Sequence, residues 1–128
     1  MMEEKILEVF NEEMEALGII YSYMVYRPDG EPKYPYVTGE YSETGYRFED
    51  GHTEGAMLLE AFTRGDELDL IRLKEKVRRH FADFRKAVPG GAVHISYGGK
   101  LPGRNEEMSL KTISITLDVK AWEEGEEE

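Results

Sequence analysis

The stretch Asp66–Val88, DELDLIRLKEKVRRHFADFRKAV, decides the predicted fold because it is the longest strongly periodic segment of the chain. Its large apolar residues recur every three or four positions, at Leu70, Leu73, Val77, Phe81, Phe84 and Val88. That spacing lines one face of an α-helix and does not fit a strand. The sequence therefore predicts a helix over residues 66–88 with a broad apolar stripe.

The ends of this segment carry the signals of a helix that begins and stops there. Asp66 is a suitable N-cap, and acidic residues follow in the first turn, where the helix dipole favours them. Arg85 and Lys86 lie in the predicted last turn, and Pro89-Gly90-Gly91 is expected to stop the helix. A stripe of six large apolar side chains needs a broad apolar partner, so we expect the helix to lie across one face of a sheet.

The flanking segments supply a second helix and the strands. Residues 3–17 carry the helical stripe Ile6, Phe10, Met14 and Leu17, with Gly18 as a natural stop. Strands are predicted at residues 19–26, 34–41, 56–63, 92–97 and 108–122, and the last of these alternates most regularly. The predicted fold class is α+β: a mostly antiparallel sheet of about four to five strands, with two helices packed on one face, in the order α-β-β-β-α-β-β.

Two polar, glycine-containing stretches interrupt this pattern. Residues 42–55, SETGYRFEDGHTEG, are expected to form either a long hairpin arm or a loop, and residues 98–107 a second loop. Residues 1–122 are expected to form a single domain of this class. The C-terminal residues 123–128, EEGEEE, are expected to be a solvated, disordered acidic tail.

Composition excludes several classes of protein. The chain has 128 residues, of which 34% are charged, and its formal net charge is -11. An acidic chain does not attract nucleic acid through its overall field, and there is no apolar run of the roughly 20 residues that span a bilayer. The absence of cysteine removes disulfides, thiolate metal sites and a cysteine nucleophile. The N-terminus lacks the pattern of a signal peptide, so we expect a cytoplasmic protein.

No catalytic signature is visible in the sequence. His52, His80 and His94 form no metal-ligand spacing, and the glycine pairs match neither a P-loop nor a dinucleotide fingerprint. We therefore expect no enzyme, no cofactor and no metal. An alternative left open is a small-molecule-binding or enzymatic domain whose site uses His94, Asp118 and Tyr97, which would have to converge in one pocket.

Two other features suggest contact surfaces. Tyr41, Tyr46 and Phe48 border the polar stretch 42–55, where exposed aromatic residues often mark a protein interface. The predicted long helix carries seven basic residues, interleaved with four acidic ones, at Arg72, Lys74, Lys76, Arg78, Arg79, Arg85 and Lys86. These basic residues are either the wet side of an amphipathic helix or, in a second alternative, the surface of a regulatory binding module.

Six motifs follow one another along the chain: YPYVTGEY (34–41), YRFEDG (46–51), AMLLEAFTRG (56–65), ELDLIRLKEKVRRHF (67–81), AVHISYGGKLP (92–102) and ISITLDVKAW (113–122). Their order resembles that of the small tail-completion proteins of tailed phages and prophages, also called tail-terminator or minor tail proteins. The similarity covers residues 1–122 and is carried by layout rather than by any catalytic motif.

The resemblance implies a structural protein of the virion tail that is assembled in the host cytoplasm. Such proteins are α+β domains that form rings, often hexameric, and the implied partners are other copies, the tail tube protein and a head-completion or connector protein. No membrane and no sequence-specific nucleic acid is implied. The two polar stretches would then carry the contacts, which adds further interaction residues to the three aromatic ones: His52, Lys100, Leu101 and Arg104.

Overall fold

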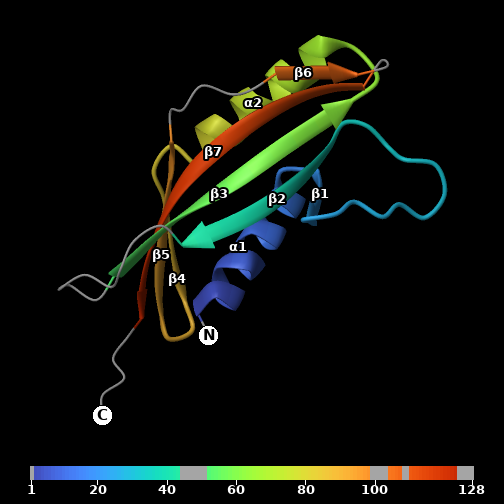
Figure 1. The fold of residues 1–128 in the computed structure, drawn as a ribbon. Coiled ribbons are helices and arrows are strands. Elements are labelled where there is room, and N and C mark those ends of the chain that lie inside the picture. The colour runs from blue at the N-terminus through green and yellow to red at the C-terminus, as the bar shows by residue number, and fades with distance from the viewer. Residues whose placement is uncertain (1, 44–51, 99–103, 108–109, 124–128) are drawn as a thin grey trace.

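The computed structural model describes residues 2–43, 52–98, 104–107 and 110–123 (Figure 1). Within these ranges two helices and seven strands follow one another along the chain. Their bounds are α1 Met2–Ala16, β1 Ile20–Tyr23, β2 Tyr36–Glu43, β3 His52–Thr63, α2 Glu67–His80, β4 Phe84–Val88, β5 Gly91–Tyr97, β6 Arg104–Glu107 and β7 Leu110–Glu123.

All seven strands belong to one sheet, in the order β1-β2-β3-β7-β5-β4, with β6 paired to the beginning of β7. Only β1 and β2 run parallel, and the other strand pairs are antiparallel. The two longest strands, β3 and β7, pair along their length and form the centre of the sheet in Figure 1. The predicted α+β class and mostly antiparallel sheet are therefore confirmed, whereas the predicted number and order of strands omitted β4 and β6.

Both helices cover the same face of the sheet, as predicted. Alternate residues of β7 point toward the helices and are buried, from Ile113 through Ile115, Leu117 and Val119 to Ala121. In β3 the buried side chains of the same alternation are Met57, Leu59 and Ala61, whereas Leu58 and Glu60 between them are exposed. Figure 1 shows α1 and α2 on one side of the sheet. We call the covered side the helix face and the other side the outer face.

The helix α1 forms and ends as its sequence predicts. Ile6, Phe10 and Met14 are buried on one stripe, and Gly18 follows the last turn with a φ of 75°. The backbone N–H of Ile19 donates to the carbonyl of Met14, which is the hydrogen bond expected where a left-handed glycine ends a helix. Glycine adopts this φ without the penalty that a side chain would add.

The long helix begins where predicted but ends earlier. The predicted start is confirmed, since Asp66 Oδ1 accepts a hydrogen bond of 3.1 Å from the N–H of Leu68. However, α2 ends at His80, and residues 84–88 form the strand β4 instead of the last helical turn. Phe84 and Val88 fit the helical stripe, but they also fit a strand in which residues 84, 86 and 88 share one face. The prediction of a helix to Val88 is therefore wrong.

Pairing with β5 explains why this segment is a strand. β4 and β5 form a hairpin in which Val88 pairs with Gly91, so that Pro89 and Gly90 are the two residues of the loop. Gly90 has a φ of 84°, and proline followed by a glycine with positive φ is the signature of a type II turn. Pro89-Gly90 therefore closes a hairpin and does not stop a helix.

The two polar stretches also contain more strand than expected. Ser42 and Glu43 continue β2 and pair with Ala56 and Gly55, and β3 begins at His52, so residues 42–55 include part of a hairpin arm. In the predicted loop 98–107, the backbone of residues 104–107 forms β6 and pairs antiparallel with β7. A polar sequence such as RNEE can form a strand where a neighbouring strand offers free backbone groups.

The two helices meet the β4 hairpin around two phenylalanines and one carboxylate. The rings of Phe10 in α1 and Phe81 after α2 lie 5.4 Å apart, and both side chains are fully buried. Next to them, Glu13 accepts a hydrogen bond of 2.8 Å from His80 Nε2 and one of 3.2 Å from Lys86 Nζ. One carboxylate of α1 thus ties the end of α2 to β4.

Replacing Phe81 by alanine is expected to lower the free energy of unfolding by about 3–5 kcal/mol, because the buried ring would leave a cavity between both helices. Denaturant unfolding followed by circular dichroism measures this loss. The matched control is Ile71→Ala on the exposed side of α2, which should change stability by about 0.5 kcal/mol or less. Equal effects of the two substitutions would contradict the described core.

The stability of the fold should depend on Glu13 at acidic pH. Burial acts to raise the pKa of its carboxyl, but the hydrogen bonds and positive charges of His80 and Lys86 hold that pKa below its usual 4.5. A carboxyl with a lowered pKa in the folded state stabilises the fold above its unfolded pKa, and this contribution is lost as pH falls through the folded pKa.

We therefore expect Glu13→Gln to reduce the difference in unfolding free energy between neutral pH and a pH below 4.5. The measurement is urea denaturation at both pH values for the wild type and the variant. Glu8→Gln, at an exposed position of the same helix, is the control and should keep the wild-type difference. An unchanged acid dependence in Glu13→Gln would show that this carboxylate does not contribute to it.

Candidate functional site

The structure describes only part of the predicted interaction set. Tyr46, Phe48, Lys100 and Leu101 lie outside the described residues, and for Arg104 the structure describes the backbone in β6 alone. Tyr41 and His52 are described, and both are largely buried, at 8% and 9% exposure. These two side chains therefore pack within the chain and present little surface to a partner.

Tyr41 is part of the core on the helix face. Its ring lies over Gly55 of the neighbouring strand, and a side chain at Gly55 would overlap with the Tyr41 hydroxyl. The backbone N–H of Tyr41 donates a hydrogen bond of 2.9 Å to the hydroxyl of Tyr23. Burial, and then the negative charges of Glu43 and Glu3 and the hydroxyl of Tyr23, raise the pKa of Tyr41 to about 12.

His52 lies at the start of β3, opposite Trp122 of β7. The two rings are 5.4 Å apart, and His52 Nε2 lies 3.2 Å from a carboxylate oxygen of Glu54. Trp122 in turn lines a hollow of about 380 Å³ at the β4–β5 end of the outer face, together with His94 and Arg85. The sequence predicted a role for His52 but could not show that its neighbour is the single tryptophan of the chain.

The outer face carries an aromatic cluster at its other end. Tyr36 of β2 stacks on Phe62 of β3 with ring centroids 4.9 Å apart, and Tyr26 stacks on Tyr36 at 4.2 Å. Tyr34 lies against the same ring at 5.6 Å. All four rings are partly exposed, and Tyr26 and Tyr34 come from the segment between β1 and β2. We call these four residues the aromatic cluster.

Beyond this cluster the centre of the outer face is open. Leu58, at the middle of β3, is 41% exposed and lies between Glu40 of β2 and Thr116 of β7. Both helices pack on the opposite face, and apart from the segment that carries Tyr26 and Tyr34, no described element lies over the outer face. The outer face is thus an open surface with one exposed leucine among polar residues at its centre and with aromatic rings toward both ends.

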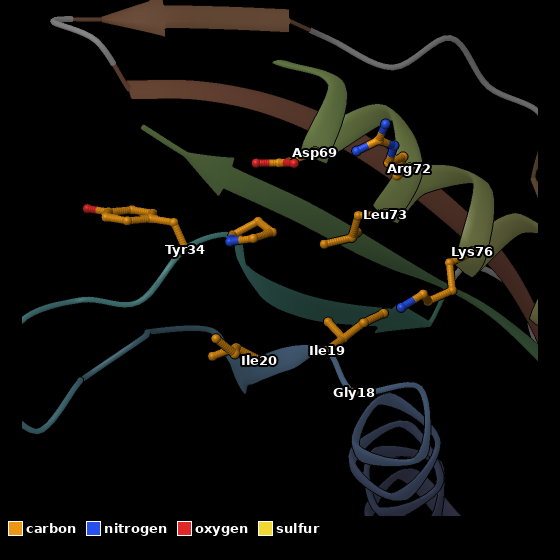
Figure 2. A pocket seen from close by; sticks show the side chains of 9 residues that line it. Gly18, Ile19, Ile20, Tyr34, Asp69, Arg72, Leu73 and Lys76 are labelled. Carbon is orange, nitrogen blue, oxygen red and sulfur yellow. The ribbon is translucent and has the colours of Figure 1, made fainter. Parts of the chain in front are cut away.

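A groove runs along α2 on the helix side of the molecule. Its first part, about 370 Å³, lies between α2 and the beginning of β1, where Leu73 points toward Ile19 (Figure 2). Tyr34, Pro35, Asp69 and Arg72 also line it. A second hollow of about 520 Å³ continues along the helix and is lined by Leu17, Arg72, Glu75, Lys76, Arg79 and His80. Arg72 and Lys76 line both parts, so the groove has a basic wall.

Five of the seven basic residues assigned to the long helix do lie on α2, but Arg85 and Lys86 lie on β4. Lys86 points to the helix face, where it pairs with Glu12 and Glu13 at 3.2 Å each. Arg85 lies on the outer face, 3.6 Å from Asp83. The basic surface of α2 is therefore shorter than the sequence analysis predicted.

The alternative site at His94 does not come together in the fold. His94 lies on the outer face, whereas Tyr97, three residues later in the same strand, packs against the core on the helix face. His94 Nε2 pairs instead with Asp83 at 2.7 Å, a hydrogen bond that, together with the nearby Arg85, lowers the pKa of Asp83. The hollow that contains His94 includes neither Asp118 nor Tyr97 among its lining residues.

Among the described residues, no group of three or more His, Asp or Glu side chains is arranged to hold a metal ion. None of the described helices is long and apolar enough to cross a membrane.

Comparison of the sequence with protein-family models found no matching family, and a search of curated proteins found no match. The resemblance to phage tail-completion proteins therefore stays a hypothesis that rests on the motifs quoted above.

Titration of the tyrosines provides a test of the buried position of Tyr41. The pKa of Tyr41 is raised to about 12, so the folded state favours the neutral phenol. The unfolded chain, with the usual pKa of 10.0, ionises first, and the folded state therefore loses stability as pH rises from 10.0 toward 12. In a spectroscopic pH titration of the folded chain, Tyr41→Phe should remove a component that ionises late. Tyr26→Phe, at a partly exposed position, is the control. Loss of an early component in Tyr41→Phe would place Tyr41 at the surface.

Proposed function

We propose that this chain is a non-enzymatic assembly protein that acts through protein–protein contacts, in tail completion or head–tail joining of a tailed phage or prophage. In this proposal several copies form a ring at the tail end and contact the tail tube protein on one side and a head-completion or connector protein on the other. The protein would be found in the virion tail, after assembly in the host cytoplasm.

The observation that carries the assembly part of the proposal is the outer face of the sheet. An antiparallel sheet with one solvated face usually alternates apolar residues inward with polar residues outward. Here the outward positions include the aromatic cluster, Leu58 and Trp122. Exposed aromatic and apolar side chains grouped among polar ones are characteristic of protein interfaces, because their burial on binding releases water from apolar surface.

The tail-specific part of the proposal rests on the sequence resemblance. The motif YPYVTGEY spans the start of β2, and AMLLEAFTRG spans most of β3 and the turn that leads into α2. The motif ISITLDVKAW is the central part of β7. Three of the six motifs thus fall on β2, β3 and β7, which are neighbours in the sheet.

Deletion of the gene in the parent phage or prophage tests this function, with the particles imaged by negative-stain electron microscopy. The expected result is filled heads beside separate tails, or tails of uncontrolled length. Normal, infectious particles would contradict the proposal.

Complementation of the deletion strain links the function to the outer face. We expect the wild-type gene to restore joined particles and Leu58→Glu to fail, because a charge at the centre of the outer face opposes burial against a partner. Ala82→Glu, at an exposed position of the turn between α2 and β4, is the control and should restore particles. Circular dichroism of both purified variants establishes that they fold. Full rescue by Leu58→Glu would exclude the outer face as the contact surface.

A further inference from the structure

The two helices cover the same face of the sheet but carry opposite charge. The helix α1 contains six glutamates and one lysine, Lys5, whose ammonium group donates to the carbonyl of Pro89. The helix α2 contains five arginines and lysines and three acidic residues. On a chain with a net charge of -11, α2 is therefore a local basic surface.

The outward side of α1 is an acidic stripe, which we define as Glu4, Glu8 and Glu15. All three are exposed, and they lie on the side of the helix opposite the buried residues Ile6 and Phe10. Lys86 of β4 forms its ion pairs with Glu12 and Glu13 of the same helix. Within the described part of the chain, no ion pair neutralises the three residues of the acidic stripe.

The side of α2 that lines the groove carries a basic stripe, which we define as Arg72, Lys76 and Arg79. All three are exposed and line the groove described above, and Lys76 Nζ donates to the carbonyl of Leu17. Glu75 lies among them, and hydrogen bonds from Arg78 and then Arg79 lower the pKa of its carboxyl. Its charge is thus shared by two arginines, and the stripe keeps a net positive charge.

The two stripes match in spacing. Glu8 and Glu15 are seven residues apart, and so are Arg72 and Arg79, which separates the charges of each pair by about 10.5 Å along the helix axis. Two helices that lie side by side can therefore bring both glutamates opposite both arginines. Leu68 and Ile71, which are 41% and 49% exposed beside the basic stripe, add apolar surface to such a contact.

We propose that two copies of this chain associate by docking the acidic stripe of α1 in one copy against the basic stripe of α2 in the other. Charge complementarity selects a second copy as the partner, because each copy carries both halves of the contact. Repeated from copy to copy, a contact between two different surfaces closes into a ring where the rotation allows it. The inference deepens the proposed assembly function and rests on it for its biological role.

Charge-reversal variants test the docking directly. The first variant, Glu8→Lys with Glu15→Lys, makes both stripes basic, and the second, Arg72→Glu with Arg79→Glu, makes both acidic. Sedimentation at low salt should show that each variant alone associates at least about tenfold more weakly than the wild type, because like charges face each other. An equimolar mixture of the two should recover association, since each stripe then meets its opposite charge. Added salt should weaken both the wild-type and the mixed complexes.

Two control variants separate this effect from a general effect of charge. Asp29→Lys with Glu31→Lys, and separately Arg27→Glu with Lys33→Glu, shift the net charge by the same amounts as the two test variants. These positions are exposed between β1 and β2, and both controls should associate as the wild type does. Failure of the mixture to associate, with both test variants folded by circular dichroism and at concentrations up to about 1 mM, would overturn the inference.

The same measurement distinguishes the inference from the proposed function. A recovered complex of any size supports docking of α1 against α2. If that complex is a closed dimer, the docking stands but the ring of the proposed function does not. If the mixture stays monomeric while deletion of the gene still leaves heads and tails unjoined, the assembly function stands and the docking surface proposed here is wrong.

Discussion

The pairing of β3 with β7 determines how the rest of the molecule is arranged. Thr63 at one end of β3 pairs with Lys111, and His52 at the other end pairs with Trp122, without a break between them. Because side chains alternate between the two faces of a sheet, a slip of one residue would turn every apolar side chain of one strand away from the helices. This register places the apolar residues of both strands beneath α1 and α2, and it places Leu58 and Trp122 on the outer face.

The two sides of the sheet therefore present surfaces of different chemical character. The helix side presents opposite charges on α1 and α2, which suits recognition between copies, since charges determine orientation more than binding strength. The outer face presents aromatic and apolar groups, which suits contacts that exclude water. A protein that binds both its own copies and other components can use such separate surfaces. The proposed docking of α1 against α2 and the proposed contact through the outer face therefore involve different residues.

The sequence predicts the parts of this fold whose signals are local. Alternation in β7, the stripe of α1, the stop at Gly18 and the N-cap Asp66 each depend on a few neighbouring residues, and all are confirmed. Residues 84–88 fit helix and strand periodicity equally, and only their pairing with β5 decides between the two. β6 is likewise formed by its neighbour and has no strand signal of its own.

The candidate sites were harder to predict because they are assembled by strand register. Tyr36 and Phe62 are far apart in the sequence and meet because β2 pairs with β3. Tyr41 is buried by the same pairing, which no property of its sequence neighbours reveals. The opposite charges of α1 and α2 can be counted from the sequence, and their place on one face of the sheet was predicted, but only the packing shows which charged residues line the groove along α2.

We propose that this chain is an assembled structural component at the end of a phage tail. Cryo-electron microscopy of intact particles from the parent phage or induced prophage is the most direct test. We expect a ring of copies at the junction of tail and head, with density that fits the seven-stranded sheet and its two helices. Complete particles that lack this chain at that junction would contradict the proposed function.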